Sequence, residues 1–321
     1  MVGAIAPGAA LLWVACGEDY TAASVPDEPV FADDEAAAPK DSAPIELGDA
    51  ADAGPPDVIT FCDAATPFQA VSALAGVNTA LDDAFPTLTD DELILYFQRG
   101  DVGGASNPTF FVAQRASRTA DFGTPVQVSE LADGLYNSFP AVTGNGAALY
   151  FGAASTIRIA KSVGVGRFST AIDVPGLAGG ETESSPSLVG GSTELWYSVP
   201  GDGGTPHFRR VVLAGDGGLG MPENIPELES TGYEIGTAST RDGLTIYFGS
   251  PRVGSQGGGD IWSATRASRS VPFSNLATVT AVNSAFDDQP GWLSADSCRL
   301  YFTTARLGTF DIFMATRPKP P

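Results

Sequence analysis

The chain has 321 residues and a formal net charge of −21, from 38 acidic and 17 basic side chains. Such a charge repels nucleic acid and anionic lipid headgroups, so the sequence predicts no nucleic-acid partner and favours cationic partners. One histidine, three cysteines and no Cys-x-x-Cys pair argue against a zinc site and against a histidine-dependent catalytic triad.

The chain begins with an apolar segment, residues 2–15, which ends directly before Cys16. It is too short to span a bilayer and is typical of an export signal. Its end resembles the signal of bacterial lipoproteins, in which a small residue such as Ala15 precedes an acylated cysteine. Two features depart from that family: Trp13 stands where Leu is usual, and no Lys or Arg precedes it. The resemblance implies a signal over residues 1–16 and an exported protein, lipid-anchored through Cys16 at the envelope (outer membrane or periplasm) of a Gram-negative bacterium. The alternatives are a plain secretory signal and a short apolar arm with a buried Cys16.

Residues 17–60 are rich in Ala, Pro, Asp and Glu. They contain twelve acidic side chains and one basic side chain, Lys40, which gives a net charge of −11. This composition provides too little apolar surface to offset the loss of chain entropy on folding. We therefore expect a disordered acidic tether. Its role would be to let a folded domain stand away from a membrane.

A repeat occupies the rest of the chain. An aromatic strand motif recurs five times, 47 to 54 residues apart, centred on Tyr96, Tyr150, Tyr197, Tyr247 and Tyr301. Each tyrosine follows a Pro or Gly by ten or eleven residues, with a two-residue turn signal between them. A glycine-rich loop and a third strand come after it, and a fourth strand follows in most units. Four short strands per unit of about 50 residues predict an all-β protein, a five-bladed β-propeller.

The fifth unit lacks its fourth strand, because the chain ends just after the third. A spare strand of matching sequence, residues 67–71, lies before the first unit. We therefore expect this N-terminal strand to complete the last blade and to close the ring over residues 61–321, which leaves no exposed sheet edge. The same closure places Cys62 and Cys298 at one edge of one blade. In an oxidising compartment they would form a disulfide; two buried thiols are the alternative.

The last two units carry a family resemblance. Asp296, the strand around Tyr301, Arg306 and the triplet beginning at Asp311 resemble the TolB-type, WD40-like propeller repeat of bacterial envelope proteins. The fourth unit matches through the triplet beginning at Asp260, and the second and third units lack this triplet. The resemblance implies an interaction platform; TolB itself binds envelope lipoproteins. Ion pairs of Arg99, Arg252 and Arg306 with Asp260 and Asp311 are expected to hold the loops within the blades.

Five loops lead into the innermost strands and should surround one mouth of the central channel. They carry polar, acidic and aromatic side chains in similar positions: Asp82, Asp83, Tyr136, Asn137, Glu181, Glu183, Tyr233, Glu234, Phe286, Asp287 and Asp288. Such a ring could bind a cationic peptide, or Ca²⁺ through oxygen ligands. The alternative is that these side chains only satisfy backbone groups of the turns.

The sequence contains no catalytic constellation, so we expect a non-catalytic, membrane-tethered propeller that binds an envelope protein, peptide or ligand and needs no cofactor. The alternative is a carbohydrate-active hydrolase. Some five-bladed propellers are glycosidases with Asp and Glu around the channel, and Asp83, Glu183 and Asp287 come from three units that could converge.

Overall fold

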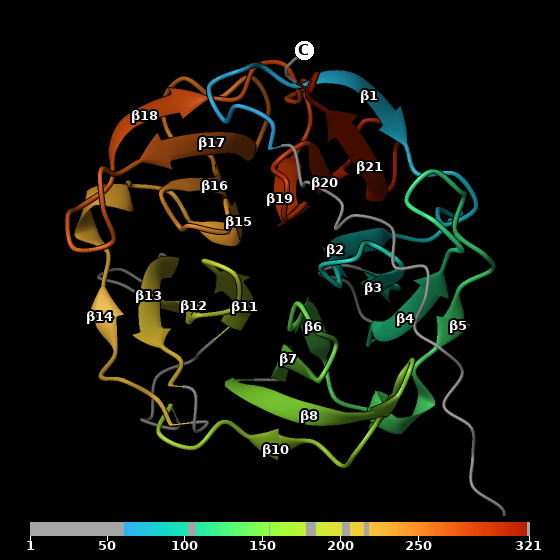
Figure 1. Cartoon of the computed structure of the whole chain (residues 1–321). Helices are drawn as coiled ribbons and strands as arrows, with labels where there is room; N and C mark the ends of the chain where they lie inside the picture. The colour runs from blue at the N-terminus through green and yellow to red at the C-terminus, as the bar shows by residue number, and fades with distance from the viewer. Residues whose placement is uncertain are drawn as a thin grey trace, which may run out of the picture. The chain divides into compact units, whose positions relative to one another are not determined.

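A computed structural model of the chain describes residues 61–101, 107–153, 155–177, 184–200, 206–214 and 218–319. The predicted signal with Cys16, the predicted tether, Glu181 and Glu183 lie outside these residues. Five antiparallel sheets surround a central axis (Figure 1), which confirms the predicted five-bladed β-propeller. No helix of the described part is both long and apolar enough to cross a membrane.

The strands of each blade follow one another from the channel outward, apart from the last, which comes from the N-terminal side. Blade 1 contains β2 (Asp83–Leu88), β3 (Ile94–Arg99), β4 (Thr109–Gln114) and β5 (Val126–Gln127). Blade 2 contains β6 (Asn137–Val142), β7 (Ala148–Ala153), β8 (Thr156–Gly164) and β10 (Ile172–Asp173), with β9 (Arg167–Phe168) beside β8. Blade 3 contains β11 (Ser184–Val189), β12 (Glu194–Pro200), β13 (Pro206–Val212) and β14 (Glu223–Asn224). Blade 4 contains β15 (Ile235–Ser239), β16 (Thr245–Ser250), β17 (Asp260–Thr265) and β18 (Ser274–Thr278). Blade 5 contains β19 (Asp288–Leu293), β20 (Arg299–Thr304), β21 (Asp311–Thr316) and β1 (Gln69–Ala73).

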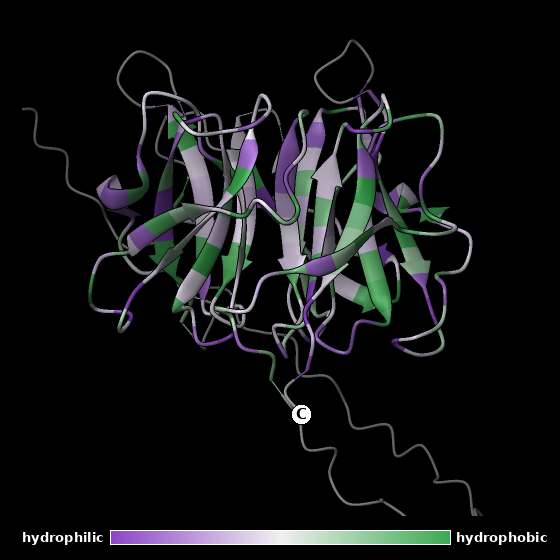
Figure 2. Ribbon diagram, turned by 90° about the horizontal axis from the view of Figure 1, so that it is seen from above, coloured by the Kyte–Doolittle hydropathy of each residue, from purple (hydrophilic) through white to green (hydrophobic). Residues whose placement is uncertain are grey.

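Two short 3₁₀ helices lie in the connections between blades: η1 (Ser129–Leu131) and η3 (Pro226–Leu228). Figure 2 shows the ring from the side, with the strands running between two faces. We call the face with the loops that enter the innermost strands the rim face. The opposite face, with the hairpins between the first and second strands, is the turn face.

The recurring tyrosines explain how one blade packs on the next. Tyr96, Tyr247 and Tyr301 are buried in the second strands of their blades. Arg115, which follows β4, donates to the Tyr301 hydroxyl at 3.0 Å, and Arg317 donates to that of Tyr247 in the same way. A buried phenol must keep a hydrogen-bond partner, so the tyrosine position fixes both the apolar packing and the register between neighbouring blades.

The innermost strands share an irregularity. A β-bulge interrupts the pairing of each of them with the second strand at the same level. Phe85, Phe139 and Ser185, each directly before a proline, have positive φ values of 54°, 51° and 52° at this bulge, and Gly236 has 59°. Non-glycine residues seldom adopt this conformation, so the prolines that recur in the sequence mark a strained ring of backbone around the channel.

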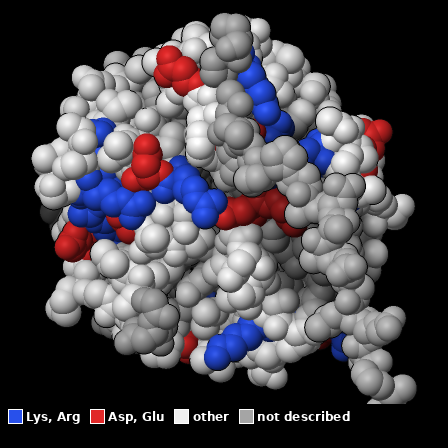
Figure 3. Space-filling view, in the orientation of Figure 1, with Lys and Arg blue, Asp and Glu red and all other residues white. Residues whose placement is uncertain are grey.

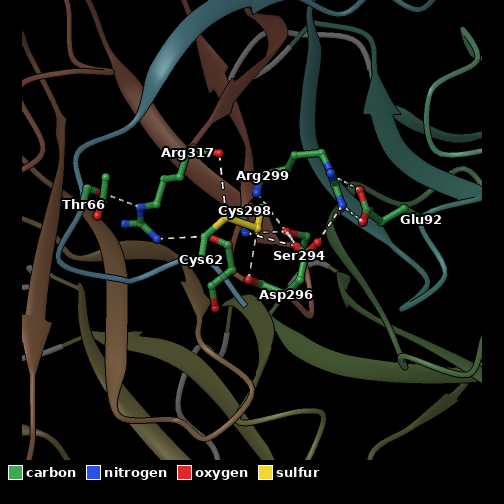
Figure 4. Close-up of a disulfide and its surroundings, with 9 residues drawn as sticks. Cys62, Thr66, Glu92, Ser294, Asp296, Cys298, Arg299 and Arg317 are labelled. Atoms are coloured by element: carbon green, nitrogen blue, oxygen red, sulfur yellow. Dashed lines mark hydrogen bonds and ion pairs between the residues drawn. A yellow bond between two sulfur atoms is a disulfide. The ribbon is translucent and has the colours of Figure 1, made fainter. Parts of the chain in front are cut away.

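The N-terminal strand closes the ring as the sequence predicts. β1 pairs with β21 and becomes the outermost strand of blade 5. Cys62 and Cys298 form a disulfide on the turn face of this blade, with their Cα atoms 5.1 Å apart (Figure 4). Beside it, Arg317 donates to the carbonyl oxygen of Thr66 at 2.7 Å. A covalent bond and a strand pairing therefore join the two ends of the repeat region.

Candidate functional site

Four rim candidates occupy equivalent places where an innermost strand begins. Asp83, Asn137, Glu234 and Asp288 are all buried, with 0, 2, 0 and 0 % of their surface exposed. Asp83 accepts from the backbone nitrogen of Thr79 at 2.7 Å, and Asp288 accepts from that of Ser284 at 2.6 Å. These two carboxylates cap the turns that precede them, in agreement with the alternative interpretation of the rim.

Three of these four residues are carboxylates, and each forms an ion pair with an arginine of its own blade. Asp83 pairs with Arg99 at 2.6 Å. Glu234 pairs with Arg252 at 3.2 Å, and Asp288 pairs with Arg306 at 2.8 Å. Each guanidinium also donates to a carbonyl oxygen of the preceding loop and lies over aromatic rings of its blade. The three carboxylates are thus parts of a repeated structural clamp.

The predicted pairing of these arginines with Asp260 and Asp311 is wrong. Asp260 accepts from the backbone nitrogens of Gln256 and Gly257 at 2.6 and 3.2 Å. Each arginine lies at the end of the second strand or just beyond it, and its guanidinium contacts the carboxylate at the start of the innermost strand. The third strand, where Asp260 and Asp311 begin, lies on the other side of the loop after the second strand.

The remaining described candidates are partly or largely exposed. Asp82 and Asp287 precede the innermost strands of blades 1 and 5, and each accepts a backbone N–H of the neighbouring blade: Phe310 N at 2.9 Å and Gly259 N at 2.6 Å. Burial raises the pKa of the Tyr233 phenol, and the negative charge of Asp287 raises it further. Tyr136 is half-buried, and Phe286 is exposed.

Three acidic residues lie near one another on the rim face at the joint between blades 5 and 1. Asp82 binds the backbone of Phe310, next to Asp311 at the start of β21, and Asp83 follows Asp82 directly. Burial raises the pKa of Asp311, and the negative charges of Asp83 and Asp82 raise it further. Burial also raises the pKa of Asp83, so the contact with Arg99 does not fully offset the cost of burying that charge. Asp82 is less buried than the other two.

Asp311 did not appear among the candidates drawn from the sequence. The signal was present, since its Asp-Ile-aromatic triplet recurs in blade 4. That triplet looks like a repeat feature until the fold brings Asp311 beside carboxylates from the other end of the chain. Sequence reasoning therefore found two members of the cluster, Asp82 and Asp83, and missed the third.

No group of three or more His, Cys, Asp or Glu side chains in the described ranges is arranged to hold a metal ion. Ca²⁺ at the rim stays a prediction. The channel does contain a cavity of about 70 Å³, but its lining runs from the bulge level to the turn face and includes none of the rim candidates.

No protein-family model matches the chain, and no curated protein sequence matches it. Solved structures do match. A thermostable family-43 glycoside hydrolase has a TM-score of 0.52 and 13 % identity, covering 76 % of this chain and 91 % of that one. The catalytic domain of a family-62 α-L-arabinofuranosidase from Coprinopsis cinerea has a TM-score of 0.52 and 12 % identity, covering 80 and 97 %.

TolB from Acinetobacter baumannii is also among the matches, with a TM-score of 0.44 and 12 % identity, covering 74 % of this chain. The chain spans about half the length of that TolB, since 55 % of it is covered. At such identities the likenesses to the two glycoside hydrolases show the propeller fold alone.

The comparisons overturn the prediction that the protein is not an enzyme. That prediction rested on the TolB-type repeat and on the lack of a catalytic constellation in the sequence. The same propeller fold is found in two glycoside hydrolases, and the match covers 91 and 97 % of their chains. The fold is thus one that carries enzymes in other proteins.

Proposed function

We propose that the protein acts on carbohydrate as a glycoside hydrolase, at the rim face between blades 5 and 1. The observation that carries the proposal is the meeting of Asp82, Asp83 and Asp311 at one joint. Glycoside hydrolysis commonly uses a pair of carboxyl groups in different protonation states on either side of the scissile bond. The fold shared with two glycoside hydrolases supports the proposal at the level of the scaffold only.

The environments of the carboxyl groups suggest their roles. Asp311 is 3 % exposed and its raised pKa favours the protonated form, which suits the general acid that protonates the leaving oxygen. Asp82 is half-buried and lies at the surface of the rim, which suits the base or nucleophile. Asp83 is occupied by Arg99 and would act by keeping the pKa of Asp311 high.

The test is the release of reducing sugar from a panel of neutral polysaccharides by the wild-type protein and by Asp82→Asn. We expect hydrolysis of at least one polysaccharide and a loss of about 10²- to 10⁴-fold in the variant. Asp121→Asn, an exposed carboxylate on the opposite face, is the control and should keep full activity. Equal activity of wild type and Asp82→Asn would contradict the proposal.

We also propose that the protein is exported and lipid-anchored through Cys16. The Cys62–Cys298 disulfide supports export, because disulfides persist in oxidising compartments. Phe61, the first described residue, directly precedes the disulfide on the turn face, so a chain attached there leaves the rim face on the far side of the ring.

Intact mass of the protein from a bacterial membrane fraction tests this second proposal. We expect a species that begins at an acylated Cys16 and gains two mass units on reduction. A species that begins at Met1 without lipid would contradict the anchor.

A further inference from the structure

The channel holds a cavity that no rim residue reaches. It lies between the bulge level and the turn face, and its lining includes Phe85, Phe139, Trp292 and four prolines together with the polar Thr87, Ser187 and Thr237. Phe85 and Phe139 stack with their ring centroids 3.9 Å apart. The cavity has a volume of about 70 Å³. Pockets that enclose a whole ligand measure about 300–1,000 Å³, so only a small group can enter this one.

One acidic and one basic side chain stand at the mouth of this cavity. Asp90, in the first hairpin of blade 1, and Arg241, in that of blade 4, are the charged residues among those that line it. Their Oδ2 and Nη1 atoms are 3.0 Å apart, although the two blades are not neighbours in the ring. Figure 3 shows the turn face, where Lys and Arg side chains extend from the side of blades 3 and 4 to the centre and meet acidic side chains there.

The other hairpins around the mouth are small, and the ion pair lies over them. Gly144 of blade 2 lies under the Asp90 carboxylate, which a Cβ at this position would approach to 2.5 Å. Gly191 of blade 3 lies under the aliphatic part of Arg241, because a Cβ at this position would lie 3.1 Å from Arg241 Cγ. Blade 5 contributes Ala295. One acid, one base and three small residues on five equivalent hairpins form a shaped site rather than a uniform repeat.

We propose that this mouth binds a free α-amino acid with a small apolar side chain. The carboxylate of the ligand would take the place of Asp90 on Arg241, and its ammonium group would bind Asp90. The side chain would enter the cavity below, beside the aromatic and proline residues of its lining. The site is distinct from the rim carboxylates and lies on the opposite face, so the proposal does not depend on glycoside hydrolysis.

The charges at the mouth favour a ligand that carries both signs. Arg241 and Asp90 keep 56 and 40 % of their side-chain surface exposed, so their mutual ion pair is weak and exchanges readily for a ligand. A ligand with a single charge would satisfy one of the two residues and leave the other without its partner. In an α-amino acid the two charged groups are adjacent, as Asp90 and Arg241 are, and the apolar group projects from between them.

The experiment is calorimetric titration of the full chain with glycine, alanine, valine and leucine, followed by the amide and the N-acetyl form of the tightest ligand. We expect a dissociation constant of about 1 mM or lower for at least one apolar amino acid and weaker binding of glycine. Both blocked forms and both variants, Arg241→Gln and Asp90→Asn, should bind about 10- to 100-fold more weakly, because each lacks one charge-assisted contact. The two variants should fold, since the pair they remove is exposed.

Lys161→Gln and Asp121→Asn are the matched controls, as exposed charges on the turn face that do not line the cavity, and they should bind like the wild type. Failure of all four amino acids to bind, or equal binding by the blocked forms, would overturn the proposal. Equal binding by Arg241→Gln or Asp90→Asn would overturn it as well.

Discussion

The joint between blades 5 and 1 and the joint between blades 2 and 3 are held in different ways. At the first, Glu92 of blade 1 accepts both Nε and Nη2 of Arg299 from blade 5, and Arg115 donates to Tyr301. At the second, no ion pair between described residues joins the blades. Their contact consists of an apolar cluster, which includes Ile157 and Leu195, and a hydrogen bond from Gly144 N to Ser192 Oγ at 3.2 Å.

The difference follows from the path of the chain. Blades 2 and 3 are consecutive, so the chain itself keeps them together. Blade 5 is completed by β1 from the other end of the repeat region, and β1 is held there by strand pairing, by the disulfide and by the packing of the buried Phe68 against Tyr247. Charged and covalent contacts are concentrated where the ring would otherwise open.

Removal of the disulfide should have the largest effect. Cys62→Ser combined with Cys298→Ser releases a cross-link that spans 236 residues, and we expect the free energy of unfolding to fall by about 3–5 kcal/mol. Urea unfolding of the full chain measures it. A loss below about 1 kcal/mol would mean that β1 holds the ring closed without the covalent bond.

Glu92→Gln should come next. Glu92 is 1 % exposed, and its loss of charge leaves Arg115 without a carboxylate and Arg299 with Asp296 alone, so we expect a loss of about 3 kcal/mol. Glu223→Gln removes the exposed partner of Arg210 and should change stability by less than about 0.5 kcal/mol. Similar losses in the two variants would contradict a special role of the closing joint.

A pair of glycine substitutions compares the two joints directly. A Cβ on Gly291 in blade 5 would overlap the backbone carbonyl oxygen of Pro86 in blade 1, so Gly291→Ala should destabilise by about 1–3 kcal/mol. A Cβ on Gly152 in blade 2 meets Ser138 Oγ at 3.3 Å and Pro186 of blade 3 at 3.7 Å, so Gly152→Ala should cost less. Thermal unfolding ranks the variants, and the reverse order would show that the second joint is the tighter one.

Acid should weaken the closing joint through Asp296, with the smallest effect. Burial alone would raise the pKa of Asp296, but the hydrogen bond from Ser294 and the charge of Arg299 outweigh it and lower the pKa below 3.8. A folded pKa below the unfolded one stabilises the fold above about pH 3.8, and this stabilisation is lost as the pH falls through the folded value. Asp296→Asn should therefore be less stable than wild type at pH 7 and approach it near pH 3. A difference that does not change with pH would contradict this account.

The sequence predicted the architecture because its signals are local and repeated. The tyrosine spacing fixed the blades, and the spare strand at residues 67–71 predicted β1 within two residues of its bounds. The disulfide followed from the same closure. These inferences need only the order of strands along the chain.

The functional site was harder to predict, because it depends on where long side chains reach. The sequence placed Asp83 and Asp288 on the rim but could not show that Arg99 and Arg306 would fold back onto them. It assigned Asp311 to an arginine, since both belong to the same repeat. The neighbours that raise the pKa of Asp311 come from residues more than 200 positions away, and a repeat pattern carries no signal of that contact.

The most direct test of the carbohydrate proposal is the activity of Asp311→Asn, measured together with its melting temperature. The folded pKa of Asp311 is raised, so its charge carries a cost in the folded state, and an uncharged side chain of the same shape removes that cost. We expect a melting temperature equal to or above that of the wild type and a loss of sugar release of about 10²-fold or more. A variant that keeps its activity, or that loses it only because it unfolds, would contradict the assignment of Asp311 as the general acid.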